Sequence, residues 1–218
     1  MSNAHVAVIL SGSGVFDGAE IHESVITLLA LSRGGATYRC AAPDKAQMHV
    51  VNHLTGQVAD GESRNVLVES ARIARGEITP LSEISAADFD AVFMPGGFGA
   101  AKNLSNFAVK GPDGEADPEL VRVLKDFRAA GKPIGAVCIS PAVLVQALGE
   151  GEVTIGSDDG TAAAIQAMGG EHAACPVTEM HVDRERRLVT APAYMVDATI
   201  ADVATGIEKA VGAVLELA

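Results

Sequence analysis

Cys138 stands where an apolar strand is expected to turn into a helix. The stretch from 135 to 141 reads Gly-Ala-Val-Cys-Ile-Ser-Pro, and proline suits the first helical turn. Small residues, Ala136 and Ser140, lie two positions on either side, as a strand–nucleophile–helix elbow requires. A helix N-terminus offers a sulfur free backbone N–H groups and a positive dipole end, which favour the nucleophilic thiolate. We therefore expect a reactive thiol at Cys138, the alternative being a buried cysteine that packs as a small hydrophobe.

A carboxylate near the start of the first expected helix is the candidate partner of this thiol. Glu23 lies in the first turns of that helix, where it could share a proton with Cys138 or act as a general base. Spacing alone favours this role of Glu23 and an ordinary surface position equally, and Glu20 is the rival carboxylate. The alternative for either residue is a solvated carboxylate, which the helix dipole favours at that end.

A glycine-rich turn supplies the third piece of a possible site. Pro95-Gly96-Gly97-Phe98-Gly99 follows an apolar strand, and consecutive glycines let backbone N–H groups approach a developing oxyanion. A tight turn that needs positive φ is the alternative. The Ser11–Gly14 stretch, Ser-Gly-Ser-Gly, has Asp17 where a dinucleotide fingerprint needs its third glycine, so we exclude NAD binding.

The remaining cysteines and histidines give weaker signals. Cys40 and Cys175 are expected to be packing residues, since neither stands at an elbow. His49 and His53 are four residues apart but lack a third ligand nearby, so no metal site is expected. Nothing in the sequence identifies a histidine partner for Cys138, so a Cys–His–acid triad is not supported.

Apolar runs alternate with amphipathic segments, which predicts a mostly parallel sheet covered by helices on both faces. Strands are expected near 5–10, 37–42, 90–94, 132–137, 153–155, 173–177 and 188–191. Helices are expected near 20–33, 64–75, 118–130, 159–168 and 198–217, with another starting at Ser140, while 45–63 is left unassigned. Ligands bind beyond the carboxyl ends of such strands, so the loops 11–19, 95–103 and 138–141 are expected to converge.

Length and composition limit the class of protein. The chain has 218 residues, 48% of them hydrophobic, which predicts a single domain over 5–218; residues 1–4 resemble a tag remnant. The net charge of −12 argues against nucleic acid and anionic membranes as partners, and no apolar run is long enough to span a bilayer. Three scattered cysteines and no secretory signal predict a reducing, cytoplasmic location.

Together, the elbow at Cys138, the Pro95-Gly96-Gly97 turn and Glu23 resemble the class I glutamine amidotransferase-like, PfpI-like superfamily. Longer stretches resemble one branch, the glyoxalase ElbB family (enhancing lycopene biosynthesis protein). They lie at residues 8–12, 14–23, 42–45, 52–56, 64–67, 95–107 and 192–195. The similarity runs from about residue 6 to the C-terminus, and the block 95–107 is the most specific.

This resemblance implies a flavodoxin-like three-layer αβα sandwich, usually a homodimer. It also implies weak, cofactor-independent glyoxalase activity on a small dicarbonyl, converting glyoxal to glycolate. Carried over by position, Cys138 matches the nucleophile and Glu23 the carboxylate that contacts it. The backbone at Gly96 and Gly97 and the Ile139 N–H match the oxyanion-binding groups. The missing histidine argues against peptidase and glutaminase activity.

Two other functions remain open on the same residues. One is a deglycase that acts on glycated protein or thiol adducts. The other is a non-catalytic interaction protein linked to isoprenoid biosynthesis, in which Cys138 is an oxidation-prone sensor stabilised by a neighbouring carboxylate.

Overall fold

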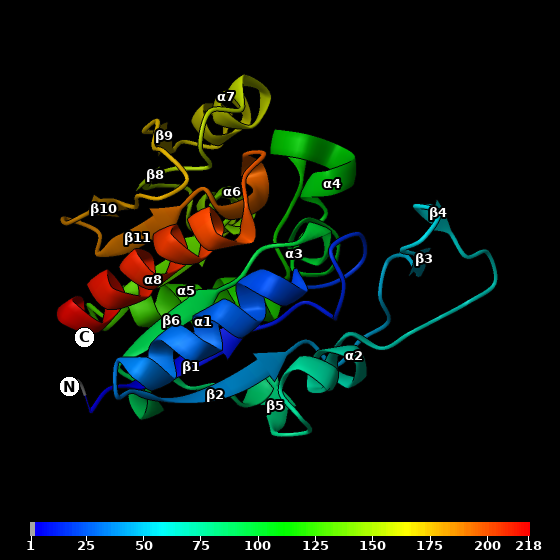
Figure 1. Ribbon diagram of the computed structural model, residues 1–218, viewed down its shortest axis with the longest axis horizontal. Coiled ribbons are helices and arrows are strands. Elements are labelled where there is room, and N and C mark those ends of the chain that lie inside the picture. The colour runs from blue at the N-terminus through cyan, green and yellow to red at the C-terminus, as the bar shows by residue number, and fades with distance from the viewer. Residues whose placement is uncertain (1–2) are drawn as a thin grey trace.

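The computed structural model describes residues 3–218 and contains a seven-stranded sheet (Figure 1). The strand order is β10-β11-β7-β6-β1-β2-β5, with every pairing parallel except that of β10 with β11. The strands are β1 (His5–Ile9), β2 (Thr37–Ala42), β5 (Ile78–Pro80), β6 (Ala91–Met94), β7 (Ile134–Val137), β10 (His181–Asp183) and β11 (Leu188–Ala191). Two-stranded pairs join β3 (Val51–Asn52) to β4 (Gln57–Val58) and β8 (Glu152–Val153) to β9 (Glu171–His172).

Helices cover both faces of the sheet, and the strand sequences explain why. In β1, Ala7 and Ile9 point into one apolar core while Val6 and Val8 point into the other, because successive strand side chains alternate between faces. The helices α1 (Ile21–Arg33) and α8 (Ile200–Leu217) lie side by side over one face, and α5 (Pro118–Ala129) and α6 (Ser140–Leu148) pack on the opposite one. This is the predicted flavodoxin-like αβα sandwich.

Capping residues fix where several helices begin. Asp117 accepts the N–H of Glu119 at the start of α5, and Pro118 occupies the first turn, where its missing N–H costs nothing. Asn65 caps α2 (Val66–Ile73), so this helix starts two residues later than the apolar pattern predicts. The short helices α3 (Phe98–Asn103) and α4 (Phe107–Lys110) follow β6, and α7 (Asp159–Ala167) follows β8.

The sheet reverses its winding between β1 and β6. From β1 the chain builds outward through β2 and β5, then returns to β6 on the other side of β1 and continues through β7 to β11. At such a switch point the loops leaving adjacent strands diverge and open a crevice at the carboxyl ends. The loops after β1, β6 and β7 therefore meet there, as the sequence predicts.

Several sequence expectations need correction. The strand expected at 173–177 does not form, and the paired residues are instead Glu171–His172. No strand was expected where the edge strands β5 and β10 and the β3–β4 pair lie. Each of these strands has three residues or fewer, which is too short to give a clear sequence pattern. Of the expected tag remnant, Met1 and Ser2 lie outside the described residues. Ala4 is buried, and its carbonyl accepts the N–H of Thr37.

Across residues 3–218, none of the helices combines the length and the apolar character that crossing a bilayer demands.

Candidate active site

The turn from β7 into α6 forms a strained elbow at Cys138. This residue has a φ of 62°, a left-handed conformation that non-glycine residues rarely adopt. The surrounding backbone holds it: the Cys138 N–H donates to the Ala191 carbonyl at 3.0 Å. The buried Ser140 hydroxyl donates to the Pro95 carbonyl at 2.7 Å, which ties the elbow to the glycine turn after β6. Strain of this kind persists only where the neighbouring structure enforces it, and it concentrates at functional sites.

Glu23, and not Glu20, is the carboxylate that meets the thiol. Its side chain is fully buried and hydrogen-bonded to Cys138. Its Oε2 accepts the Gly96 N–H at 2.9 Å, and its Oε1 accepts the Tyr194 N–H at 3.2 Å. Glu20 instead caps α1, accepting the Glu23 N–H at 2.7 Å. The structure thus assigns different roles to Glu23 and to its rival, Glu20.

Gly96 makes this meeting of thiol and carboxylate possible. A Cβ on Gly96 would lie 2.3 Å from Cys138 Cβ, 2.8 Å from its Sγ and 2.7 Å from Glu23 Oε2. All three distances are shorter than real Cβ contacts, so only glycine fits at this position. The next residue, Gly97, has a φ of 96°, and a Cβ there would lie 2.4 Å from the backbone of Gly18 and Glu20.

The environment of Glu23 makes it a carboxyl that can both hold and release a proton near neutral pH. Burial and, after it, the negative charge of Glu20 raise its pKa from 4.5 to about 7. Hydrogen bonds from the Tyr194 N–H, the Cys138 thiol and the Gly96 N–H act in the opposite direction, because they stabilise the carboxylate. Glu23 is therefore suited to general acid–base chemistry.

The expectation of a resting thiolate needs correction. Burial raises the pKa of the Cys138 thiol well above its ordinary value, and the negative charge of Glu23 raises it further. Hydrogen bonds from the backbone N–H groups of Gly97 and Ile139 lower it, as expected at a helix N-terminus, but by less. The sulfur is thus a thiol at rest, and it becomes a nucleophile when its proton is removed.

The backbone N–H groups around the sulfur divide into two roles. Those of Gly97 and Ile139 are directed at Cys138, so they also face an atom that bonds to this sulfur. The Gly96 N–H is already donated to Glu23. Gly96 therefore does not supply the oxyanion contact expected of it, and its backbone holds the carboxylate instead.

A cavity of about 450 Å³ opens beside Cys138. Its wall combines the loop after β1, helices α3 and α4, the start of α7 and the turn after β11. Three aromatic residues, Phe98, Phe107 and Tyr194, contribute to it. No sequence pattern places α4 or α7 here, because neither helix directly follows a strand of the main sheet.

Tyr194 is a site residue that sequence reasoning did not assign a role. Its backbone N–H reaches Glu23 because the preceding Ala193 adopts a φ of 44° in the turn after β11. Its hydroxyl lies 3.0 Å from Nδ1 of His22, the neighbour of Glu23 on α1. Among the described residues that line the cavity there is no histidine, so His22 is linked to the site only through Tyr194.

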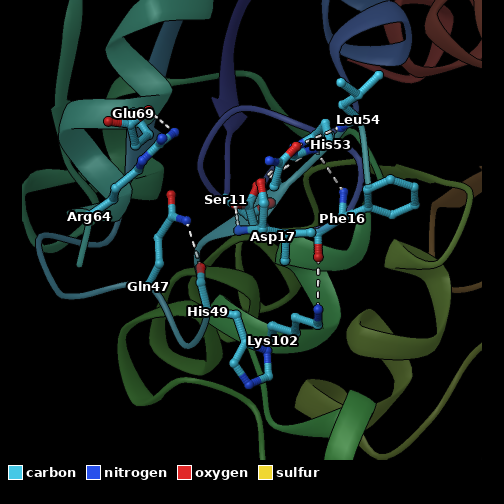
Figure 2. A network of polar contacts seen from close by, with 12 residues as sticks. Ser11, Phe16, Asp17, Gln47, His49, His53, Leu54, Arg64, Glu69 and Lys102 are labelled. Atoms are coloured by element: carbon cyan, nitrogen blue, oxygen red, sulfur yellow. Dashed lines mark hydrogen bonds and ion pairs between the residues drawn. The ribbon is translucent and has the colours of Figure 1, made fainter. Parts of the chain in front are cut away.

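A polar network fastens the loop after β1 (Figure 2). The Phe16 N–H donates to His53 Nε2 at 3.2 Å, and Asp17 accepts the Val51 N–H at 2.7 Å. From the other side, Lys102 on α3 donates to the Phe16 carbonyl at 2.8 Å. The segment that carries β3 therefore holds this loop in place beside the cavity. His53 has a structural role in this contact.

The other two cysteines differ from each other. Cys40 is buried in the sheet, and burial raises its pKa to about 12, as fits a packing residue. Cys175 is partly exposed, so it is not the packing residue that was expected. Within residues 3–218, no cluster of three or more His, Cys, Asp or Glu side chains could hold a metal ion.

Comparison with known proteins identifies the family of this chain. Residues 13–197 match the model of the DJ-1/PfpI family. The chain belongs to the DJ-1/PfpI family. The match covers most of the chain, including the elbow cysteine and the buried glutamate beside it.

Relatives and a solved structure match nearly the whole chain. A human protein named glutamine amidotransferase-like class 1 domain-containing protein 3, mitochondrial, is 52% identical over 98% of this chain and 83% of its own length. The rat ES1 protein homolog, mitochondrial, is 50% identical over 98% of this chain and 84% of its own. A crystal structure from Ehrlichia chaffeensis, described as an isoprenoid biosynthesis protein with amidotransferase-like domain, has a TM-score of 0.92 at 40% identity. It covers 98% of this chain and 99% of its own.

These names correct one expectation. Sparse cysteines and no secretory signal predict a cytoplasmic location, yet the human and rat relatives are both named as mitochondrial proteins. Cysteine usage reports a reducing compartment and does not distinguish one such compartment from another.

Proposed function

We propose that this member of the DJ-1/PfpI family is a cofactor-independent glyoxalase of the ElbB branch, converting glyoxal to glycolate. The single observation that carries the proposal is the buried hydrogen-bonded pair of Cys138 and Glu23 beside an open cavity. The resemblance of block 95–107 to the ElbB branch supports it, and so does the similarity to a protein described as an isoprenoid biosynthesis protein. The homodimer expected from the same resemblance stays a prediction.

The first step joins the Cys138 sulfur to one aldehyde carbon of glyoxal. Glu23 accepts the thiol proton as the carbon–sulfur bond forms, which avoids a free thiolate in the buried site. The aldehyde oxygen then faces the N–H groups of Gly97 and Ile139, which already point at the sulfur. Glu23 gives the proton on to that oxygen, which yields a hemithioacetal and leaves Glu23 as the carboxylate that the next step needs.

The second step moves hydrogen between the two carbons. Glu23 removes the C–H proton of the hemithioacetal carbon, giving an enediol, and a proton is returned to the neighbouring carbon. The product is the glycolyl thioester of Cys138, which water hydrolyses to glycolate and the free thiol. One water is consumed overall, so no external oxidant or reductant is required.

Glycolate formation by two variants tests the proposal. We expect Cys138→Ala to abolish turnover, because no covalent adduct can form. Glu23→Gln should lower kcat by roughly 10²–10⁴-fold, the usual contribution of a positioned acid–base group. Cys175→Ser serves as the matched thiol control and should retain full turnover. Unchanged turnover in either site variant would remove that residue from the mechanism.

A further inference from the structure

The cavity beside Cys138 is much larger than the substrate that the family resemblance implies. Glyoxal has four non-hydrogen atoms, which fill about 120 Å³ even at roughly 30 Å³ each, the volume of a liquid water molecule. The cavity measures about 450 Å³, a volume within the range of pockets that hold larger organic ligands. Most of its space is therefore available to a part of the substrate that does not react.

Much of the wall of this space is apolar. Phe98 and Ala101 come from α3, Phe107 from α4 and Met195 from the turn after β11. An apolar group that packs against these side chains lowers the free energy of binding, because apolar surface is removed from water. Aromatic rings also accept flat or cationic groups on their faces. An apolar body attached to the reacting aldehyde would be bound here.

The charge of the cavity has one sign. Glu20 and Asp158 contribute to its wall, and among the described lining residues there is no Lys, Arg or His. Asp158 caps α7, and hydrogen bonds from Thr161 lower the pKa of its carboxyl, so it is ionised at neutral pH. Glu20 is largely buried, and its negative charge acts on Glu23 nearby. A carboxylate or phosphate entering this space would meet two like charges on its wall. The Lys102 ammonium lies 5.5 Å from the centroid of the Phe98 ring, but it donates to the Phe16 carbonyl and is not part of the wall.

We propose that the cavity selects neutral or cationic aldehydes with an apolar body of several carbons and rejects aldehydes that carry a carboxylate or phosphate. This inference rests on the proposed function, since it names the substrate class for Cys138. Glu20 and Asp158 are its charge-selecting residues. Phe98 and Phe107 contact the body of the substrate.

Entry of charged probes to Cys138 tests charge selection without any turnover. Methanethiosulfonates convert a thiol to a mixed disulfide and release methanesulfinate, and they are available with sulfonatoethyl (anionic) and trimethylammonioethyl (cationic) groups. Each rate is divided by that of the same reagent with 2-mercaptoethanol. The background is Cys175→Ser, because Cys175 is partly exposed, and Cys138→Ala gives the residual rate.

We expect the cationic reagent to modify Cys138 at least about tenfold faster than the anionic one, within the range that charge-lined clefts produce. Glu20→Gln with Asp158→Asn should lower this ratio, because two negative charges leave the wall while Glu23 beside the sulfur remains. Both amides keep an oxygen that can cap the helix, so the fold should be retained. Glu185→Gln, an exposed acid between β10 and β11, makes the matched control and should keep the ratio. A ratio near one in the parent protein, or one that the double variant keeps, overturns the proposal.

Substrate turnover tests the size component. Phenylglyoxal, which is neutral and carries an aromatic body, should be converted to mandelate with a higher kcat/KM than glyoxal is to glycolate. Glyoxylate, a small anionic aldehyde, should inhibit poorly if at all. If phenylglyoxal is turned over more slowly than glyoxal, the apolar wall does not bind substrate. If probes are selected by charge but no dicarbonyl is turned over, the glyoxalase proposal fails and the selectivity of the cavity stands.

Discussion

The Gly96 backbone lies against Cys138 so closely that a Cβ on the glycine would be 2.3 Å from the Cβ of the cysteine. The same missing side chain leaves room for Glu23 Oε2, which the Gly96 N–H holds at 2.9 Å. One glycine therefore sets both the distance between thiol and carboxyl and the orientation of the carboxyl. Its importance is steric, and we can test it as such.

Gly96→Ala should be strongly destabilising. The added methyl meets the Cβ of Cys138, which belongs to a strained backbone and cannot move aside as a flexible side chain would. Overpacking of this kind costs about 1–3 kcal/mol or more, measured as the free energy of unfolding in urea. Gly212→Ala on α8 is the matched control, because its added Cβ meets nothing within 4 Å. That control should gain about 0.5–1 kcal/mol, since alanine is the better helix former. Equal stabilities of the two variants would contradict the packing described here.

The raised pKa of Glu23 should make the protein less stable as pH rises toward neutrality. In the unfolded chain this carboxyl loses its proton near 4.5, whereas in the folded protein it keeps the proton until about 7. Between these values the unfolded state binds fewer protons, so the stability contributed by protonated Glu23 is present below 4.5 and lost by about 7. The difference amounts to about 3 kcal/mol at roughly 1.4 kcal/mol per pKa unit.

The measurement compares unfolding free energies of the wild type and Glu23→Gln across this pH range. The variant cannot titrate at this position, so the wild type should lose about 3 kcal/mol relative to it between pH 4.5 and 7. Glu185→Gln, at an exposed position, should track the wild type. A constant difference between wild type and Glu23→Gln would show that the buried carboxyl titrates normally.

Removing the negative charge of Glu23 should also move the ionisation of Cys138 to lower pH. That charge and the Glu23 hydrogen bond both raise the pKa of the thiol, while the Gly97 and Ile139 N–H groups that lower it remain in the variant. Thiolate absorbance in Glu23→Gln should therefore appear at lower pH than in the wild type. Cys138→Ala identifies the signal. Glycolate formation should fall in the same variant, so thiolate content and turnover would change in opposite directions. A midpoint shifted upward would mean that Glu23 stabilises the thiolate, contrary to the structure.

The sequence predicts the architecture of the site better than its electrostatics. Cys138, Ala136 and Ser140 reveal the elbow because a strand-to-helix turn has strict steric needs that one chain segment displays by itself. The prediction of a thiolate at Cys138 was wrong because the burial of its sulfur depends on elements distant in sequence. Local N–H groups act as expected, but burial and Glu23 outweigh them.

The same distinction explains the pair Glu20 and Glu23. Both fit the start of α1, and contacts distant in sequence, such as that of the Gly96 N–H 73 residues further on from Glu23, decide which one meets the thiol. Tyr194 was missed for a similar reason. Its contact with Glu23 is made by a backbone N–H, and a backbone contact carries no signature in the type of the residue.

Ser140→Ala should separate the elbow from the glycine turn. The Ser140 hydroxyl is fully buried and donates to the Pro95 carbonyl at 2.7 Å, so the variant leaves a buried carbonyl without its partner. An unsatisfied buried group of this kind costs about 1–3 kcal/mol, which urea unfolding measures directly. Ser82→Ala, at an exposed position, should change stability by less than about 0.5 kcal/mol. Because the lost bond connects Cys138 to the turn that carries Gly97, turnover per folded molecule should fall as well. A Ser140→Ala protein with wild-type stability and turnover would mean that the N–H groups facing the sulfur are positioned without this bond.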